Sequence, residues 1–267
     1  MDLCSHGHLA TTAQLASLGW TRSQLAAAPI VRVRRGVYAC VHLSGPLLVA
    51  ATLGGALTCV SVLREFGVWS GHDRRVHVQV RPTASVPAGR TRLHWDIPRF
   101  GMETPWRASR MQALWQAMNC LPVEDAVAAM ESALRTGFLT EVQVRGLGMH
   151  APRRLQRYVP QLINDSGSGN ETIVRFRLLN AGYRLVPQGA LPGVGHQDLV
   201  IEDCLGLEID SARWHGEQIR ALDYERDLIS VGLGRPVLRI LPAHIHSSWP
   251  QTLSVIDRMV RDAQRRR

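Results

Sequence analysis

The sequence of 267 residues contains no lysine, so its 31 Lys and Arg residues are all arginines. Any mechanism that needs a lysine is therefore excluded. A basic segment followed by an apolar one is absent from the N-terminus, so we expect no secretory signal and a cytoplasmic location. The best candidate for a membrane span, residues 44–63, carries no charge but is interrupted by Gly, Pro, Ser and Thr, so we expect a buried helix and no membrane contact.

Cysteine is also scarce. The five cysteines are Cys4, Cys40, Cys59, Cys120 and Cys204, and no two of them form a CxxC motif. This pattern argues against a disulfide framework and against a zinc ribbon. We expect reduced thiols, most of them in the core.

Positive charge is abundant. Lys and Arg together number 31 against 22 Asp and Glu, which gives a formal net charge of +9. Because contacts to phosphate release counterions, a basic surface favours a nucleic-acid partner. Hydrophobic residues at 45% exclude global disorder, and the length predicts two or three cores.

Residues 1–40 have the pattern of two short helices followed by a hairpin. Thr11 or Thr12 is suited to cap the first helix, Gly19 to end it and Thr21 to cap the second. This outline predicts a helix-turn-helix.

Residues 30–39 alternate valine with arginine and carry a glycine where a tight turn would fall. In a winged helix-turn-helix, the second helix enters the major groove and such a hairpin lies along the DNA backbone. The residues that we expect to contact DNA are Arg22, Ser23, Gln24, Arg32, Arg34 and Arg35. The pattern also fits a small helical cap with a solvated basic hairpin.

Farther along, residues 47–66 are apolar and predict a helix, residues 75–81 and 91–95 predict strands, and residues 109–118 and 123–134 predict helices. The order of elements after residue 170 is helix, three strands, helix and strand, which predicts an α/β core with a mixed sheet. We therefore expect an α/β protein, α+β overall. Its parts are a winged helix at 1–40, a connecting α+β domain at 41–150, a linker at 151–169 and a nuclease-like α/β domain at 170–267.

Carboxylates gather in the stretch from His196 to Asp210. If residues 202–204 form the bend of a hairpin, Asp198 lies opposite Glu208 and His196 opposite Asp210, all on one face. Like charges directly opposite each other destabilise a sheet, and a divalent cation is the simplest compensation. Hard oxygen ligands suit Mg²⁺ or Mn²⁺, so we expect Asp198, Glu208 and Asp210 to form a metal site. A solvated sheet face is the alternative.

Other side chains could serve the same site. His215 follows the second carboxylate strand and could act as general acid or base, or could be a surface histidine. Glu171 could add a catalytic carboxylate, although it also fits a capping box with Ser168. Three charged residues on the next helix could position the site or lie on a solvated face: Asp223, Arg226 and Asp227.

Two stretches of the chain resemble known families. Residues 8–40, with TTAQLASLGWTRSQL and VRVRRGVYA, resemble the winged helix-turn-helix of AbiEi-type antitoxins from type IV toxin–antitoxin systems. Residues 41–150, including LLVAATLGGALTC, are similar to the domain that follows it in actinobacterial relatives.

Residues 168–245 resemble the domain related to very-short-patch-repair (Vsr) endonucleases, in the PD-(D/E)XK nuclease superfamily. The motifs that carry this resemblance are Glu171, the Asp198 strand, the Glu208-Ile-Asp210 strand, Trp214-His215, the helix with Asp223, Arg226 and Asp227, and the strand PVLRIL at 236–241. The resemblance implies a Mg²⁺-dependent DNA-cleaving site. In it, Asp198 would be the principal metal ligand, Glu208 or Asp210 the second, and His215 the acid or base. Asp210 stands where the superfamily has a lysine.

Two functions follow as hypotheses. The first is a DNA-binding protein with a metal-dependent endonuclease domain, acting in repair or defence. The second is a non-catalytic transcriptional regulator or antitoxin with a cognate toxin as partner, in which the nuclease fold is degenerate. RNA binding is a third hypothesis, but the sequence has no aromatic-rich sheet motif that would support it.

Overall fold

The computed structural model of the chain contains both helices and strands. It describes residues 3, 8–87, 89–193, 195–210 and 228–266, apart from the side chain of Arg22. The mixed α/β fold predicted from the sequence is confirmed. The chain forms two units. The N-terminal unit contains Met1–Leu121 and Phe138–Gln156, and the C-terminal unit contains Pro122–Gly137 and Arg157–Arg267.

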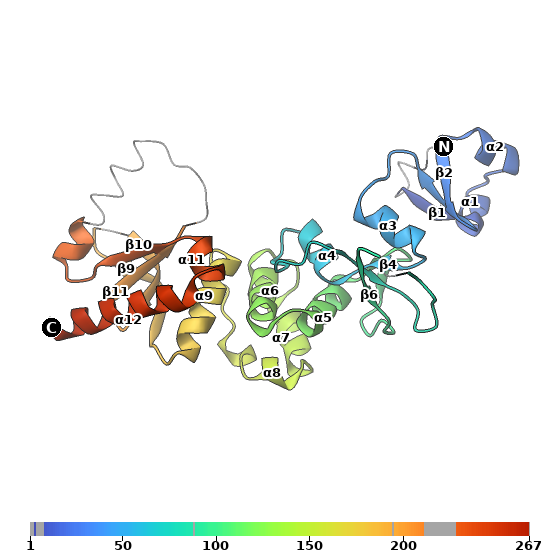
Figure 1. The fold of residues 1–267 in the computed structure, drawn as a ribbon. Coiled ribbons are helices and arrows are strands. Elements are labelled where there is room, and N and C mark those ends of the chain that lie inside the picture. The colour runs from blue at the N-terminus through green and yellow to red at the C-terminus, as the bar shows by residue number, and fades with distance from the viewer. Residues whose placement is uncertain (1–2, 4–7, 88, 194, 211–227, 267) are drawn as a thin grey trace. The chain divides into compact units, whose positions relative to one another are not determined.

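The first elements of the N-terminal unit form a helix pair and a three-stranded sheet (Figure 1). They are β1 Leu9–Thr11, α1 Thr12–Ser17, α2 Arg22–Ala27, β2 Ile30–Arg34 and β3 Val37–Cys40, with strand order β1-β3-β2. Thr11 and Thr21 cap the two helices, as the sequence predicts. Each also forms a capping box, because its hydroxyl accepts the N–H of a glutamine three residues later and the side chain of that glutamine accepts the threonine N–H. Leu15, Ala10 and Cys40 form the small core under this pair.

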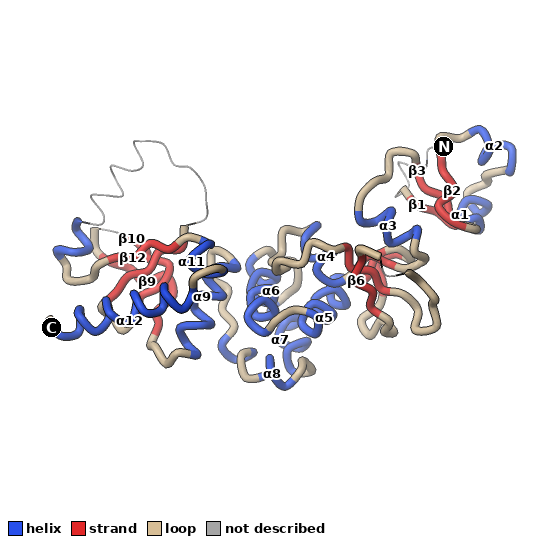
Figure 2. Tube along the Cα trace, viewed as in Figure 1, coloured by secondary structure: helices blue, strands red, loops and turns tan. Residues whose placement is uncertain are grey.

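A five-stranded sheet and four helices complete the N-terminal unit (Figure 2). The strands, in the order β6-β5-β4-β8-β7, are β4 Ala56–Leu57, β5 Val76–Gln79, β6 Thr91–His94, β7 Met102–Thr104 and β8 Arg107–Ala108. The helices that belong to it are α3 Pro46–Thr52, α4 Cys59–Glu65, α5 Arg110–Cys120 and α7 Glu141–Met149, with the single turn α8 Arg153–Gln156 after them.

The single helix predicted over residues 47–66 is wrong. Gly54 has φ of +72° and ends α3, and β4 then separates α3 from α4. A Cβ on Gly55 would lie 2.4 Å from the carbonyl oxygen of Gln79, so only glycine permits this approach of β4 to β5. An apolar run alone does not reveal such a close backbone contact.

The C-terminal unit contains a four-stranded mixed sheet with the order β12-β11-β10-β9. Its elements are α6 Val123–Arg135, η2 Val159–Gln161, α9 Gly169–Asn180, β9 Leu185–Leu191, β10 Gly195–Ile201, β11 Leu205–Ile209, β12 Val237–Ile240, α11 Pro242–His246 and α12 Trp249–Arg265. Strands β11 and β12 are parallel, and the other neighbours are antiparallel. Figure 1 shows α12 running alongside this sheet.

Helix α6, expected in the connecting domain, packs on α9 of the C-terminal unit. At this contact Glu131, 1% exposed, forms an ion pair with Arg175 and accepts hydrogen bonds from the Ile163 N–H at 3.0 Å and the Thr172 hydroxyl at 2.8 Å. The segment expected as a linker at 151–169 is folded, because its apolar side chains, such as Leu162, are buried.

Candidate functional site

The hairpin that carries the predicted carboxylates has the expected bend. Glu202 and Asp203 have φ of +50° and +57°, and the Cys204 N–H donates to the Ile201 carbonyl at 3.0 Å, as in a type I′ turn. The observed pairs Ile201–Leu205 and Leu199–Leu207 follow the register predicted from the sequence.

Strict alternation along β10 is interrupted next to Asp198. A Cβ on Gly206, the partner of Val200, would lie 2.5 Å from the side chain of Gln197, so Gln197 and Val200 face the same side although they are three residues apart. On the neighbouring strand, Gln188 has φ of +48° at this point. The sequence argument that placed every second residue on one face therefore does not hold through Asp198.

Asp198 and Glu171 come together around Gln188. The Asp198 carboxylate accepts the Ile209 N–H at 2.8 Å, and the Gln188 side chain hydrogen-bonds to it. The same Gln188 donates from Nε2 to Glu171 Oε2 at 3.5 Å. Glu171 lies in the first turn of α9, where Ser168 caps the helix and the Gly167 N–H donates to Glu171 Oε2 at 2.7 Å.

These carboxyl groups repel one another. Burial raises the pKa of Asp198, and the negative charge of Asp210 raises it further. Burial likewise raises the pKa of Glu171, followed by the charge of Asp198. Glu171, Asp198 and Asp210 are thus electrostatically coupled, and we call them the acidic group.

Glu208 is not part of that group, because it has a cationic partner. Its Oε2 accepts from Arg239 Nε at 2.9 Å across the parallel pair β11–β12. The inference that Glu208 needs a divalent cation for compensation is therefore wrong. Asp210 follows directly after β11 and is exposed.

Several predicted residues lie outside the described part of the chain: His215, Asp223, Arg226 and Asp227. Sequence reasoning missed Gln188 and Arg239. Gln188 carries no charge and gave no signal. Arg239 lies in the final predicted strand, but the spacing of residues along the chain does not reveal that this strand pairs in parallel with β11.

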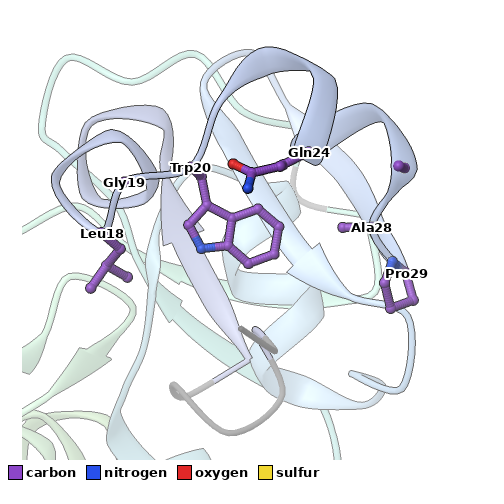
Figure 3. A pocket seen from close by; sticks show the side chains of 7 residues that line it. Leu18, Gly19, Trp20, Gln24, Ala28 and Pro29 are labelled. Carbon is purple, nitrogen blue, oxygen red and sulfur yellow. The ribbon is translucent and has the colours of Figure 1, made fainter.

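In the predicted recognition helix α2, some of the polar side chains are hydrogen-bonded to the residue that caps the same helix. The Gln24 amide oxygen accepts the Thr21 N–H at 2.8 Å, and the hydroxyl groups of Ser23 and Thr21 are 3.0 Å apart. The NH2 end of Gln24 is then the part of this side chain that can donate to a base. A hollow of about 370 Å³ lies between α2 and the turn before it, where Figure 3 shows Trp20 beside Gln24.

On the predicted wing, Arg32, Arg34 and Arg35 are exposed. The guanidinium of Arg34 lies over Gly54, where an added Cβ would be 3.2 Å from its nitrogen. Of the two valines that alternate with arginine in β2, Val33 is partly buried against the core, whereas Val31 is 47% exposed. For Arg32 and Arg35, no comparable contact of the guanidinium with a glycine is seen among the described residues.

A second group of ligand-type side chains lies in the N-terminal unit. Cys59, His77, His94 and Cys120 form the one set of three or more His, Cys, Asp or Glu among the described residues that could hold a metal ion. Burial raises the pKa of the Cys59 thiol, and hydrogen bonds from Cys59 and then from the two imidazoles lower the pKa of Cys120. The residues expected to bind metal, Asp198, Glu208 and Asp210, do not converge in this way in the part of the chain that is described.

The four described cysteines differ in oxidation state. Cys59, Cys120 and Cys204 are reduced thiols, as expected, whereas Cys40 is disulfide-bonded, so the expectation of reduced cysteines throughout is wrong.

No protein-family model matches the chain, and a search of curated proteins finds no match either. Among the described helices, none has the length and apolar character that crossing a bilayer requires.

Proposed function

We propose that the chain is a DNA-binding protein whose C-terminal unit is a metal-dependent endonuclease, with the N-terminal winged helix holding the DNA. The observation that carries the proposal is the acidic group, whose members come from α9, from β10 and from the residue after β11. Glu171 from α9 and Asp198 from β10 share Gln188. Burial raises the pKa of both, the charge of Asp198 raises that of Glu171 further, and the charge of Asp210 raises that of Asp198. Perturbed carboxylates brought together from a helix and a strand favour a functional site.

The donor set fits Mg²⁺ or Mn²⁺ in part. Asp198, Asp210 and Glu171 offer hard carboxylate oxygens, which these ions prefer, and a cation would relieve their repulsion. Such an ion lowers the pKa of a bound water and stabilises charge on a phosphate. Glu208 already has a cationic partner in Arg239, so we assign it to positioning β11 against β12.

The test is nicking of supercoiled, mismatched and branched DNA by the full chain with Mg²⁺ or Mn²⁺. We expect Asp198→Asn to reduce cleavage by about 100-fold or more while DNA affinity is unchanged. Asp203→Asn is the matched control, because Asp203 lies in the exposed turn of the same hairpin and asparagine tolerates its φ of +57°. The absence of cleavage by the wild type, or equal rates in both variants, contradicts the proposal.

A second candidate is a regulator or antitoxin that binds DNA without cleaving it. The pairing of Glu208 with Arg239 favours this candidate, because it places a cation where a metal ligand was expected. A footprint on the chain's own promoter that does not depend on metal, together with no nicking, would identify this function.

A further inference from the structure

Two cysteines and two histidines converge in the N-terminal unit from four separate elements. Cys59 begins α4, His77 lies in β5, His94 in β6, and Cys120 ends α5. One ligand atom from each lies within 4.8 Å of all the others. Since β5 and β6 are parallel with His77 opposite Arg92, His94 two residues later is on the same face of the sheet.

The distances are close to those of a tetrahedral metal site. His77 Nδ1 is 3.1 Å from His94 Nε2, and Cys120 Sγ is 3.9 Å from His77 Nδ1. Bond lengths of about 2.0–2.1 Å from zinc to nitrogen and about 2.3 Å to sulfur separate tetrahedral ligand atoms by about 3.3–3.8 Å. Only small side-chain movements are needed to bind an ion.

The orientation of His77 is also that of a metal ligand. Its Nε2 lies 3.3 Å from Asp73 Oδ2, on the side of the ring away from His94. Asp73 is held by Arg75, whose backbone N–H and guanidinium both donate to it at 3.0 Å or less. A proton on Nε2, donated to this carboxylate, leaves the lone pair of Nδ1 directed at the cluster. Histidines that bind zinc commonly have such a carboxylate partner.

We propose that Cys59, His77, His94 and Cys120 bind one structural Zn²⁺ ion in the N-terminal unit. Thiolate and imidazole ligands select zinc rather than Mg²⁺ or Mn²⁺, so this site is chemically distinct from the acidic group. Cys59 and His77 are fully buried, and four protein ligands complete a tetrahedral shell without an open position for substrate. The ion would join α4 and α5 to the sheet.

The first experiment measures the metal content of the untagged full chain, purified with reductant and without chelator, and after incubation with Zn²⁺. We expect about one zinc per chain, and after replacement by Co²⁺ an absorption spectrum of tetrahedral, thiolate-bound cobalt. Cys120→Ser and His94→Gln should each lose the zinc and this spectrum. Cys204→Ser is the matched control, because Cys204 is a buried reduced thiol in the C-terminal unit, and it should retain both.

The second experiment uses Asp73→Asn, which leaves all four ligands in place. Removing a carboxylate that orients a histidine ligand should weaken zinc affinity by about 10–100-fold in competition with a chelator. Asp262→Asn, on the exposed side of α12, should have no effect.

A wild-type chain without zinc after reconstitution, zinc retained by both ligand variants, or a Cys59–Cys120 disulfide under reducing conditions would overturn the proposal. None of these outcomes depends on DNA cleavage, so the zinc site and the proposed nuclease are tested separately.

Discussion

Glu171 and Asp198 are carboxyl groups that the fold keeps partly out of water and close to each other. Burial and repulsion raise the pKa of both, so the folded chain favours their protonated forms. A pKa that is higher in the folded state than in the unfolded state stabilises the fold at low pH. This stabilisation is complete below the pKa of the unfolded state, about 4.3 for glutamate, and is lost as the pH rises through the pKa of the folded state. At neutral pH the acidic group therefore destabilises the fold, which is a common cost of a functional site.

We expect Glu171→Gln to stabilise the chain at pH 7, because glutamine resembles the protonated carboxyl group and its oxygen can still accept the Gly167 N–H. The gain should shrink as the pH falls towards 4. Thermal unfolding across this range measures it, with about 2–4 °C expected for each kcal/mol. Glu103→Gln is the control, because Glu103 is exposed on β7. A variant that is less stable than the wild type at pH 7 would contradict this assignment of charge repulsion.

At the scale of elements, the first 40 residues form a helix pair and a three-stranded sheet, and we propose that they bind DNA as a winged helix. A capping box holds helix α2, and the β2–β3 hairpin carries the exposed Arg32 and Arg35. Among the described residues, Arg34 differs in having its guanidinium over Gly54 of the same unit. This difference predicts unequal contributions of the three arginines to DNA binding.

Replacing Arg32, Arg34 and Arg35 together with alanine should weaken DNA affinity and flatten its dependence on salt. Each phosphate contact contributes about 0.9 to the slope of log K against log salt, so the slope should fall by about 2 to 3. Equilibrium binding at several salt concentrations measures it. The control is a triple variant that removes the same charge from exposed arginines of α12 and its C-cap, namely Arg261, Arg265 and Arg266. Equal slopes in the two variants would show that the wing does not contact phosphate.

The contact between α6 and α9 depends on a buried charge. We expect Glu131→Ala to lower the free energy of unfolding by about 3–5 kcal/mol, because it leaves Arg175 buried without its partner. Urea denaturation of the full chain measures the loss. Glu141→Ala removes an exposed ion pair with Arg145 on α7 and should cost about 0.5 kcal/mol or less. Similar losses for both variants would mean that the Glu131 network contributes little.

At the scale of the whole molecule, the chain passes between its two units three times. Residues 122–137 leave the N-terminal unit to form α6, and residues 138–156 return to it before the rest of the C-terminal unit is built. The two units are therefore not separated by one cut in the sequence. The sequence suggests a domain boundary near residue 150. A boundary at that position would separate α6 from the C-terminal unit, to which it belongs.

A fragment of residues 151–267 should fold poorly, because the face of α9 that packs on α6 is uncovered and Arg175 loses Glu131. A fragment of residues 120–267 restores α6 and should unfold cooperatively. Circular dichroism during urea denaturation compares the two. A sharp transition in the shorter fragment would show that α6 is dispensable.

The sequence by itself determined the local features of this protein. Capping at Thr11 and Thr21, the bend at Asp203 and the register of β10 with β11 depend on residues a few positions apart, so their spacing was enough to predict them. Only the tertiary structure decided which distant side chains meet. Arg239 reaches Glu208 through a parallel strand pair, and α6 covers α9. The Cys and His ligands converge from positions as far apart as Cys59 and Cys120, because sheet pairing and helix packing, rather than spacing along the chain, bring them together.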